Sequence, residues 1–420
     1  MLNFCNAFFK CLFEPLFCTA SMWRKKSYVA LGVYIGAYLR KRLRYLHQNY
    51  VMYNDDFLHK KLQERISVNA LRTLIVPQAK IDFCSNDYLG IVKNGLLDTG
   101  NSNFANGSTG SRLLAGNYTL VEETEALIAA FHQSEAALIF NSGYDANLGV
   151  IASVPQRGDT IIYDALSHAS IRDGIRLSFA QSFPFAHNNM DALEKKLAQA
   201  TGNVFVVTES VFSMDGDTCP LQEIIALCGA YNAHLMLDEA HATGVIGERG
   251  EGLAQHVNLH DKIFCRIHTF GKACGCHGAV VLGSSHLKSY LINFARSFIY
   301  STSLPPHAVG VINASYATFP TMHAERLHLQ KLINLFQSAE TGYTKFVSHT
   351  PIQVVLVPSN EAVKKVAQTL QQSGLDVRPI LYPTVPKEKE RLRIVLHAFN
   401  TEEEVGRLVG VLRYAELSVP

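Results

Sequence analysis

The chain has 420 residues, of which 48% are hydrophobic and 18% are charged, the composition of a soluble globular protein with room for one large and one smaller domain. A formal net charge of +2 argues against nucleic acid or another acidic polymer as a partner. Nine scattered cysteines, an odd number, argue against a disulfide framework and predict a reducing, cytoplasmic setting, and their spacing indicates no metal site.

Residues 1–51 differ in character from the rest of the chain. They contain Trp23, the only tryptophan, and their apolar stretches are shorter than the roughly 20 residues that a membrane span needs. We therefore expect no stable membrane span. We expect Met52 to be the functional start, with an atypical leader before it; an amphipathic membrane anchor is the alternative.

Residues 52–95 are predicted to form an N-terminal arm. Apolar residues at helical spacing predict an amphipathic helix over 55–75, which Pro77 is expected to end. A short strand is expected at 81–83, followed by a turn rich in Asn, Asp and Gly at 85–90.

A large domain is predicted over residues 96–312. After a helix at 120–132, short apolar runs alternate with helical stretches; the expected strands are 137–140, 160–163, 204–208, 234–237, 264–268 and 280–282. Short strands that are apolar on both sides indicate an α/β fold, with a mostly parallel central sheet and helices on both faces. Ligands bind such sheets at the carboxyl ends of the strands.

The pattern changes past about residue 315. It predicts a long helix, a strand at 352–357, a helix at 360–373, and strands near 375–381 and 392–396. Residues 313–420 are therefore expected to form a small C-terminal α+β domain.

Polar groups that suit pyridoxal phosphate (PLP) follow several of the predicted strands. The cofactor needs an amine for its aldehyde, an anion beside the pyridine nitrogen, a flat group against the ring, and donors for its phosphate. Lys272 follows one strand and could supply the amine, although a lysine taken alone is usually exposed. Asp238 could supply the anion, and is by itself equally suited to capping a helix. A lone histidine such as His168 is more often structural than catalytic.

The order and spacing of these groups are more specific than any one of them. Over residues 55–415 the chain resembles the α-oxoamine synthase family of fold-type I PLP enzymes. The matching segments are Ser85–Gly90, Gly107–Arg112, Asp164–Ser170, Thr208–Asp217, Asp238–His241, Thr269–Lys272 and Tyr300–Ser303.

The resemblance implies a role for each site residue. Lys272 forms the Schiff base with PLP, Asp238 pairs with the pyridine nitrogen, and His168 stacks on the ring. The other residues implied to bind or flank the cofactor are Gly143, Tyr144, Glu209, Ser213, His241 and Thr269. Thr302 and Ser303 would reach the phosphate of the neighbouring subunit, which implies a homodimer with a shared active site.

The implied reaction joins an amino acid to an acyl-CoA or acyl carrier protein thioester, with loss of carbon dioxide. Asn86 and Arg393 would hold the amino-acid carboxylate, since an arginine fork binds a carboxylate bidentately. The fine pattern resembles the branch that joins alanine to a pimeloyl thioester in biotin synthesis, in which Arg72 would face the distal acyl carboxylate. Arg72 is equally suited to a solvated helix position.

Two further branches and one non-enzymatic class are the alternatives. The branches join glycine to acetyl-CoA or serine to palmitoyl-CoA. Non-catalytic partner subunits of the family lack the lysine, whereas Lys272 is present here. Glu239 stands where the family more often has a second aspartate, and Cys274 and Cys276 stand where small apolar residues are usual.

Overall fold

The computed structural model describes residues 37–38, 41, 54–76, 79–97 and 104–417. The chain divides into two compact units, Met1–Leu71 and Arg72–Pro420. Apart from residues 37, 38 and 41, the expectations for residues 1–51 lie outside the described ranges. Within those ranges, no helix combines the length and the apolar character that crossing a membrane requires.

In the first unit, one helix is shorter than predicted. Helix α3 spans Asp56–Ser67, so the expectation of a helix continuing to residue 75 was wrong. Asn69 adopts a left-handed conformation with φ of +53°, and its backbone N–H donates to the Ile66 oxygen at 2.9 Å. Asparagine tolerates this conformation better than most residues, and it commonly ends a helix.

The second unit contains a seven-stranded sheet with the strand order β2-β8-β7-β6-β5-β3-β4. The strands are β2 Ala136–Phe140, β3 Thr160–Asp164, β4 Gln181–Phe185, β5 Val204–Glu209, β6 His234–Asp238, β7 Cys265–Thr269 and β8 Ala279–Gly283. Strand β8 is antiparallel to both of its neighbours and the remaining pairs are parallel, which confirms the mostly parallel sheet. The edge strand β4 was not predicted.

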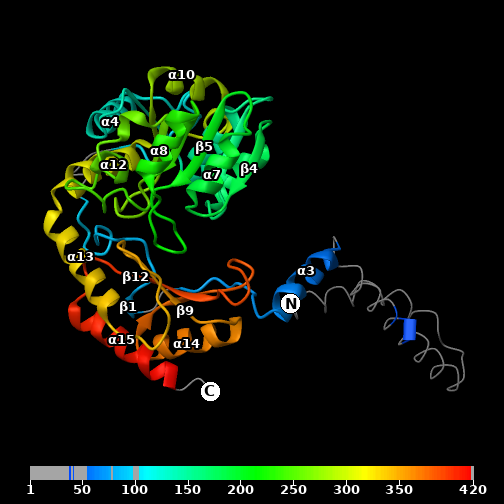
Figure 1. Ribbon diagram of the computed structural model, residues 1–420, viewed down its shortest axis with the longest axis vertical. Helices are drawn as coiled ribbons and strands as arrows, with labels where there is room; N and C mark the ends of the chain where they lie inside the picture. Colours follow the sequence, from blue (N-terminus) through cyan, green and yellow to red (C-terminus); the bar gives the residue numbers. More distant parts are fainter. Residues whose placement is uncertain (1–36, 39–40, 42–53, 77–78, 98–103, 418–420) are drawn as a thin grey trace, which may run out of the picture. The chain divides into compact units, whose positions relative to one another are not determined.

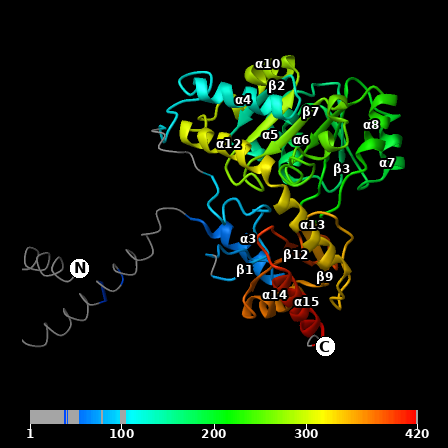
Figure 2. The ribbon, with the colours of Figure 1, turned by 90° about the vertical axis from the view of Figure 1, so that its left-hand side faces the viewer.

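Both faces of the sheet are buried, as expected. Along β5, Phe205 and Val207 pack into one apolar cluster and Val204 and Val206 into another. Helices α5, α6, α10 and α11 contribute to the first cluster, and α7, α8 and α9 to the second (Figures 1 and 2). The helices are α4 Thr119–Phe131, α5 Gly143–Ser153, α6 Ala169–Leu177, α7 Met190–Leu197, α8 Leu221–Ala230, α9 Leu253–His256, α10 Ser285–Phe294, α11 Arg296–Ile299 and α12 Pro306–Thr318, with short 3₁₀ helices η2 His260–Lys262 and η3 Phe319–Thr321.

Helix α4 carries a buried carboxylate. Glu125 accepts hydrogen bonds from Arg112 at 2.7 Å, Lys288 at 2.8 Å and the Ile139 backbone N–H at 3.0 Å. These contacts join the Gly107–Arg112 segment to the sheet. Glu125 therefore acts through two ion pairs and a backbone hydrogen bond.

The C-terminal part contains a small antiparallel sheet with the order β11-β12-β9, and a two-stranded parallel pair of β1 and β10. Its elements are β1 Ile81–Asp82, β9 Ile352–Leu356, β10 Leu375–Asp376, β11 Arg378–Ile380, β12 Arg391–Val395, and the helices α13 His323–Ser338, α14 Asn360–Gln372 and α15 Glu402–Leu417 (Figure 1). These elements confirm the predicted α+β pattern. The domain boundary expected at residue 313 falls within α12 and stays a prediction.

The pairing of β1 with β10 brings the predicted turn at 85–90 to the small sheet. The Val395 backbone N–H donates to the Phe83 oxygen at 2.9 Å, and the Ala398 N–H donates to the Tyr88 oxygen at 2.8 Å. Residues some 310 positions apart in the sequence therefore meet beside the carboxyl ends of the large sheet.

Candidate active site

The neighbouring strands β5, β6 and β7 all end at one cavity of about 230 Å³. It is lined by Asn86, Ser142, Gly143, Tyr144, Asn147, His168, Ser170, Glu209, Asp238, Ala240, His241, Thr269, Gly271, Lys272, His277 and Gly278. The cavity lies at the carboxyl ends of the parallel strands, as the sequence pattern predicted.

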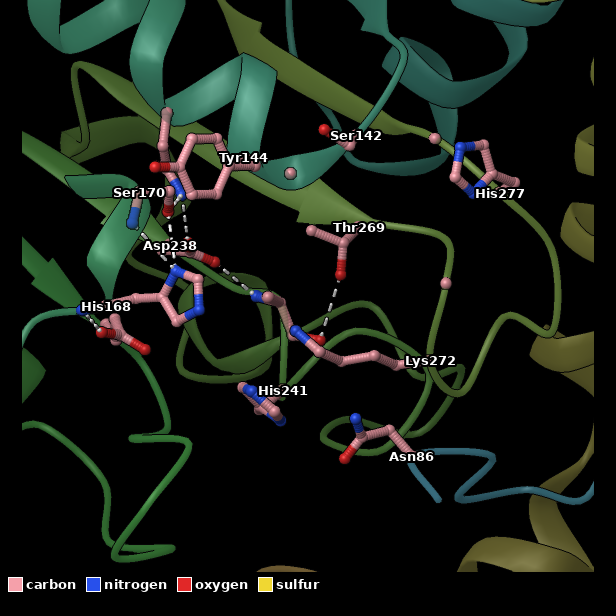
Figure 3. Close-up of a pocket in the computed structure, with 16 residues that line it drawn as sticks. Asn86, Ser142, Tyr144, His168, Ser170, Asp238, His241, Thr269, Lys272 and His277 are labelled. Carbon is pink, nitrogen blue, oxygen red and sulfur yellow. Dashed lines mark hydrogen bonds between the residues drawn. The ribbon is translucent and has the colours of Figure 1, made fainter. Parts of the chain in front are cut away.

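Lys272 lies on a tight loop after β7 and extends across the cavity toward Asp238 and His168 (Figure 3). The loop is closed by the Gly275 N–H, which donates to the Lys272 oxygen at 2.9 Å. Gly275 has φ of +64°, and a Cβ there would lie 2.4 Å from Ile91, so the loop requires glycine. Burial lowers the pKa of the Lys272 amine, against the opposing charges of Asp238 and Glu209.

Asp238 ends β6 and is 6% exposed. Its Oδ1 accepts from the Ala240 N–H at 2.8 Å, and its Oδ2 accepts from the Asn147 side-chain amide at 2.7 Å. The first bond closes a turn after the strand. It does not cap a helix, because residues 240–245 form turns and the next helix, α9, begins at Leu253, so the helix-capping alternative was wrong. These two donors satisfy the buried carboxylate and fix its orientation beside the cavity.

His168 precedes α6 and faces the same cavity (Figure 3). Its backbone N–H donates to Glu209 Oε1 at 2.6 Å, which fixes the loop between β3 and α6 against the end of β5. Burial lowers the pKa of the His168 imidazole, with Asp238 acting in the opposite direction. Burial, together with the nearby charge of Asp238, raises the pKa of Glu209 well above its usual range.

A hydrogen-bonded network joins His241 to the small sheet. The Tyr88 hydroxyl lies 2.6 Å from His241 Nδ1 and donates to Asn86 Oδ1 at 3.2 Å. Arg393 donates through Nη2 to Asn86 Oδ1 at 3.0 Å, and through Nε to the Ser213 backbone oxygen at 2.7 Å. Burial lowers the pKa of His241 well below its usual range, and the nearby Lys272 and Arg393 charges act in the same direction.

The start of α5 supplies donors for an anion. The first helical hydrogen bond runs from the Ala146 N–H to the Ser142 oxygen, so the Gly143 and Tyr144 amides precede the helical ladder. A Cβ on Gly143 would lie 2.4 Å from Thr269 Cγ2, so only glycine lets the helix start approach the end of β7. The Tyr144 hydroxyl donates to Asp173, while its side chain lines the cavity (Figure 3).

Five predicted site residues lie outside this cavity lining. Ser213 and Arg393 belong to the network described above, and the other three are Arg72, Thr302 and Ser303. Thr302 accepts at its backbone oxygen from Asn141 at 2.8 Å, and the Ser303 N–H donates to the Gly110 oxygen at 3.0 Å. Arg72 donates to Thr384 Oγ1 at 2.9 Å and is exposed in the single chain. Their assigned roles concern a partner subunit and a distal acyl group, and both roles stay predictions.

Sequence reasoning missed Asn147 and gave Ser170 no role, although both line the cavity. Asn147 lies four residues after Gly143 on α5, and this i,i+4 spacing places the two residues on one face of the helix. That spacing was the available signal.

The residues of the cavity fit PLP. They provide an amine, a buried carboxylate across the cavity from it, an imidazole, and the backbone amides at the start of α5. The four requirements set out from the sequence therefore meet around one space.

Comparisons with known proteins agree with this site. A model of the family described as aminotransferase class I and II matches residues 78–412. The 8-amino-7-oxononanoate synthase of Emericella nidulans is 40% identical over 390 residues, covering 85% of this chain and 94% of that protein.

Two solved structures are similar across most of the chain. A serine palmitoyltransferase from S. paucimobilis with bound PLP and myriocin has a TM-score of 0.77 and 27% identity, covering 86% of this chain and 97% of its own. An 8-amino-7-oxononanoate synthase from Francisella tularensis has a TM-score of 0.65 and 27% identity, covering 80% and 97%.

The chain belongs to the aminotransferase class I and II family, with the type I fold of PLP-dependent transferases. Within that class it is a member of the α-oxoamine synthases, and its cofactor is PLP.

Proposed function

We propose that this protein condenses L-alanine with a pimeloyl thioester to give 8-amino-7-oxononanoate. One C–C bond forms between the alanine α-carbon and the acyl carbon; the thiol leaves, and the alanine carboxylate departs as carbon dioxide. The observation that carries the proposal is the 40% identity to the Emericella nidulans synthase along 94% of that enzyme. The cavity, together with Arg393 beside it, supplies groups for each part of the reaction.

Arg393 and Asn86 are proposed to bind the alanine carboxylate. Arg393 is fixed by its Nε bond to the Ser213 oxygen, and its Nη2 is 3.0 Å from Asn86 Oδ1. A guanidinium held from one side presents its remaining N–H groups in a rigid plane, which suits a planar carboxylate.

Lys272 is proposed to take the alanine α-proton. PLP, when bound, supplies an electron sink for the charge that develops at the α-carbon. The lowered pKa of Lys272 increases the fraction of neutral amine that can accept a proton near neutral pH. The Asp238 carboxylate lies on the opposite side of the space that Lys272 crosses (Figure 3).

His168 is proposed to stabilise the acyl oxygen as the new C–C bond forms. A neutral imidazole N–H can donate to an oxygen that gains negative charge, and burial strengthens that interaction. The lowered pKa of His168 favours the neutral ring.

Serine palmitoyl transfer is a second candidate. The solved serine palmitoyltransferase covers 86% of this chain at a TM-score of 0.77, so the fold alone accommodates either reaction. The solved synthase is also 27% identical, so the structures do not separate the two reactions. The curated relatives at 38–40% identity are named 8-amino-7-oxononanoate synthase, which makes serine palmitoyl transfer the weaker candidate. The remaining alternative is the condensation of glycine with acetyl-CoA, which uses the same type of reaction.

Assembly and location are also proposals. We propose a cytoplasmic homodimer in which Thr302 and Ser303 complete the partner's phosphate site. Both residues follow α11 and lie beside Gly110 and Asn141 rather than in the cavity of their own chain. The acyl group is carried by CoA or by acyl carrier protein.

A substrate panel tests the proposed function. Alanine, glycine and serine are each offered with acetyl-, pimeloyl- and palmitoyl-CoA, and thiol release is measured. Alanine with pimeloyl-CoA should give the largest kcat/KM. Faster turnover of serine with palmitoyl-CoA, or of glycine with acetyl-CoA, would assign the protein to another branch.

A further inference from the structure

Two side chains without an assigned role connect Asp238 to His168. The Asn147 amide on α5 donates to Asp238 Oδ2 at 2.7 Å and to Ser170 Oγ at 3.1 Å. Ser170 Oγ lies 2.8 Å from His168 Nδ1. Asn147 is 2% exposed and Ser170 is fully buried, so water does not replace these bonds easily. Dashed lines in Figure 3 mark these contacts.

The chemistry of the groups fixes the direction of each hydrogen bond. An ionised Asp238 can only accept, so Asn147 must present its amide nitrogen. The second amide hydrogen points to Ser170 Oγ, which leaves the Ser170 hydroxyl hydrogen free to donate to His168 Nδ1. The Ser170 backbone N–H also donates to Nδ1, at 3.2 Å. With two donors directed at Nδ1, a neutral His168 carries its proton on Nε2.

We propose that Asn147 and Ser170 are positioning residues that hold His168 in the Nε2–H form and tie its ring to the Asp238 carboxylate. We call this pair the Asn147–Ser170 bridge. The importance of the Nε2 proton rests on the proposed function, in which His168 donates to the acyl oxygen. Through this bridge, His168 and Asp238 belong to one hydrogen-bonded unit. His168 serves the acyl oxygen, and Asp238 serves the cofactor nitrogen.

The backbone closes this unit into a ring. The His168 N–H donates to Glu209 Oε1 at 2.6 Å, and Glu209 is the register partner of Asp238 on the adjacent strand. A Cβ on Gly174 of α6 would lie 3.2 Å from the Asn147 backbone oxygen, so glycine allows α5 and α6 to approach closely. This approach brings Asn147 within reach of Ser170.

The bridge has a consequence for the pH dependence of turnover. The charged or titratable groups near His168 are Asp238, Lys272, Asp173, Glu209 and His241. Burial lowers the pKa of His168, and a hydroxyl donating to Nδ1 further disfavours a proton there. Removing that hydroxyl should therefore raise the pKa of His168 and move the acidic limb of the kcat profile to higher pH.

The test combines imidazole NMR with a double-mutant cycle in the holoenzyme. In ¹⁵N-histidine-labelled protein, with His168 assigned by its absence in His168→Gln, we expect an unprotonated Nδ1 and a protonated Nε2. Asn147→Leu and Ser170→Ala should each bring the two nitrogen shifts closer together and lower kcat about tenfold. Ser170→Thr keeps the hydroxyl and should restore the wild-type shifts.

The double variant Asn147→Leu/Ser170→Ala shows whether the two residues act together or independently. If Asn147 acts through Ser170, the double variant loses no more kcat than the more severe single variant. Additive losses, a protonated Nδ1 in the wild-type enzyme, or unchanged shifts in Ser170→Ala would overturn the proposal. Ser170→Ala decides the question by itself if Asn147→Leu does not fold.

Ser153→Ala is the matched control. It removes a buried hydroxyl at the far end of α5, where Ser153 Oγ donates to the Gly149 oxygen at 2.6 Å, and it should leave the pH profile in place. The nitrogen shifts do not depend on which acyl thioester reacts. If the nitrogen shifts differ from those expected but alanine is still condensed, only the bridge is overturned. If the shifts are as expected but alanine is not condensed, only the proposed function is overturned.

Discussion

At the scale of single residues, the chemistry of the cavity depends on which of its side chains are charged and which are neutral. Asp238 has a neutral donor on each oxygen, whereas burial acts against the charged forms of Lys272, His168 and His241. The site therefore combines a carboxylate that is hydrogen-bonded at both oxygens with a lysine and two histidines whose neutral forms are favoured by burial. That combination suits proton abstraction followed by stabilisation of a developing oxyanion.

Asp238→Asn tests the role of the Asp238 carboxylate. The amide should leave PLP bound, because Lys272 and the start of α5 are unchanged, but it cannot hold a proton on the pyridine nitrogen by charge. Exchange of the alanine α-proton in D₂O, followed by NMR, should slow roughly 100-fold or more. Asp159→Asn changes a buried carboxylate beside the start of β3 and is the control. Wild-type exchange in Asp238→Asn would show that another group pairs with the ring nitrogen.

Arg72→Ala tests acyl selectivity. A pimeloyl chain ends in a carboxylate, and a cation near its end would favour that donor over uncharged ones. The variant should lose about 1.5–3 kcal/mol in kcat/KM with pimeloyl-CoA and little with acetyl-CoA, while Arg72→Lys should lose less. Equal losses with both donors would assign Arg72 to another task, such as its bond to Thr384.

At the scale of elements, the strands with continuous apolar runs were predictable and the interrupted segments were not. Six strands of the large sheet follow from such runs. Strand β4 was missed because its sequence, Gln181–Phe185, includes a serine and a proline and lies at the exposed edge of the sheet. The α3 helix was predicted too long, because leucine spacing continues past Asn69, whose backbone conformation ends the helix.

In the site, too, the residues within recognisable sequence segments were predictable and the others were not. Lys272, Asp238 and His168 belong to recognisable ordered segments, and the structure brings them to one cavity. The spacing from Gly143 indicates only which face of α5 carries Asn147. Its hydrogen-bond partners lie 23 and 91 positions away in the sequence, and such contacts are determined by the packing of α5 against α6 and β6.

His187 is another such residue, and it holds two loops of the site together. Its Nδ1 lies 2.9 Å from Asp164 at the end of β3, and its Nε2 lies 2.7 Å from Asp217. Burial opposes the charged ring, but the hydrogen bonds to both carboxylates outweigh it and raise the pKa of His187 to about 10.

The stabilisation by His187 should depend on pH. Because its pKa is raised above the unfolded value of about 6.5, the contribution is fully present below about pH 6.5 and is lost as the pH rises through about 10. His187→Gln should lower the free energy of unfolding by about 2 kcal/mol at pH 7, with a smaller difference at pH 10. His328→Gln, whose ring bonds a backbone oxygen, is the control. A His187 effect of equal size at both pH values would contradict this account.

At the scale of the whole molecule, the proposed homodimer predicts complementation between two inactive variants. Lys272→Ala removes the amine, and a variant with Thr302→Ala and Ser303→Ala removes the groups proposed to serve the partner's site. In a mixed dimer, one site would have an intact lysine together with intact Thr302 and Ser303. Mixing the two variants and allowing their subunits to exchange should therefore restore activity. The molar mass of the mixture is measured by light scattering in the same experiment. A monomeric mass, or no recovery in mixed dimers, would oppose a shared site.

The central claim is that carbon–carbon bond formation at Lys272 is coupled to loss of the amino-acid carboxylate. The most direct measurement follows [1-¹³C]alanine and pimeloyl-CoA in a single reaction, with released ¹³CO₂ and free CoA quantified together. We expect one ¹³CO₂ for each CoA with the wild-type enzyme, and neither product above background with Lys272→Ala. Release of CoA without ¹³CO₂ would mean simple acyl transfer or hydrolysis, and would contradict the proposed decarboxylative condensation.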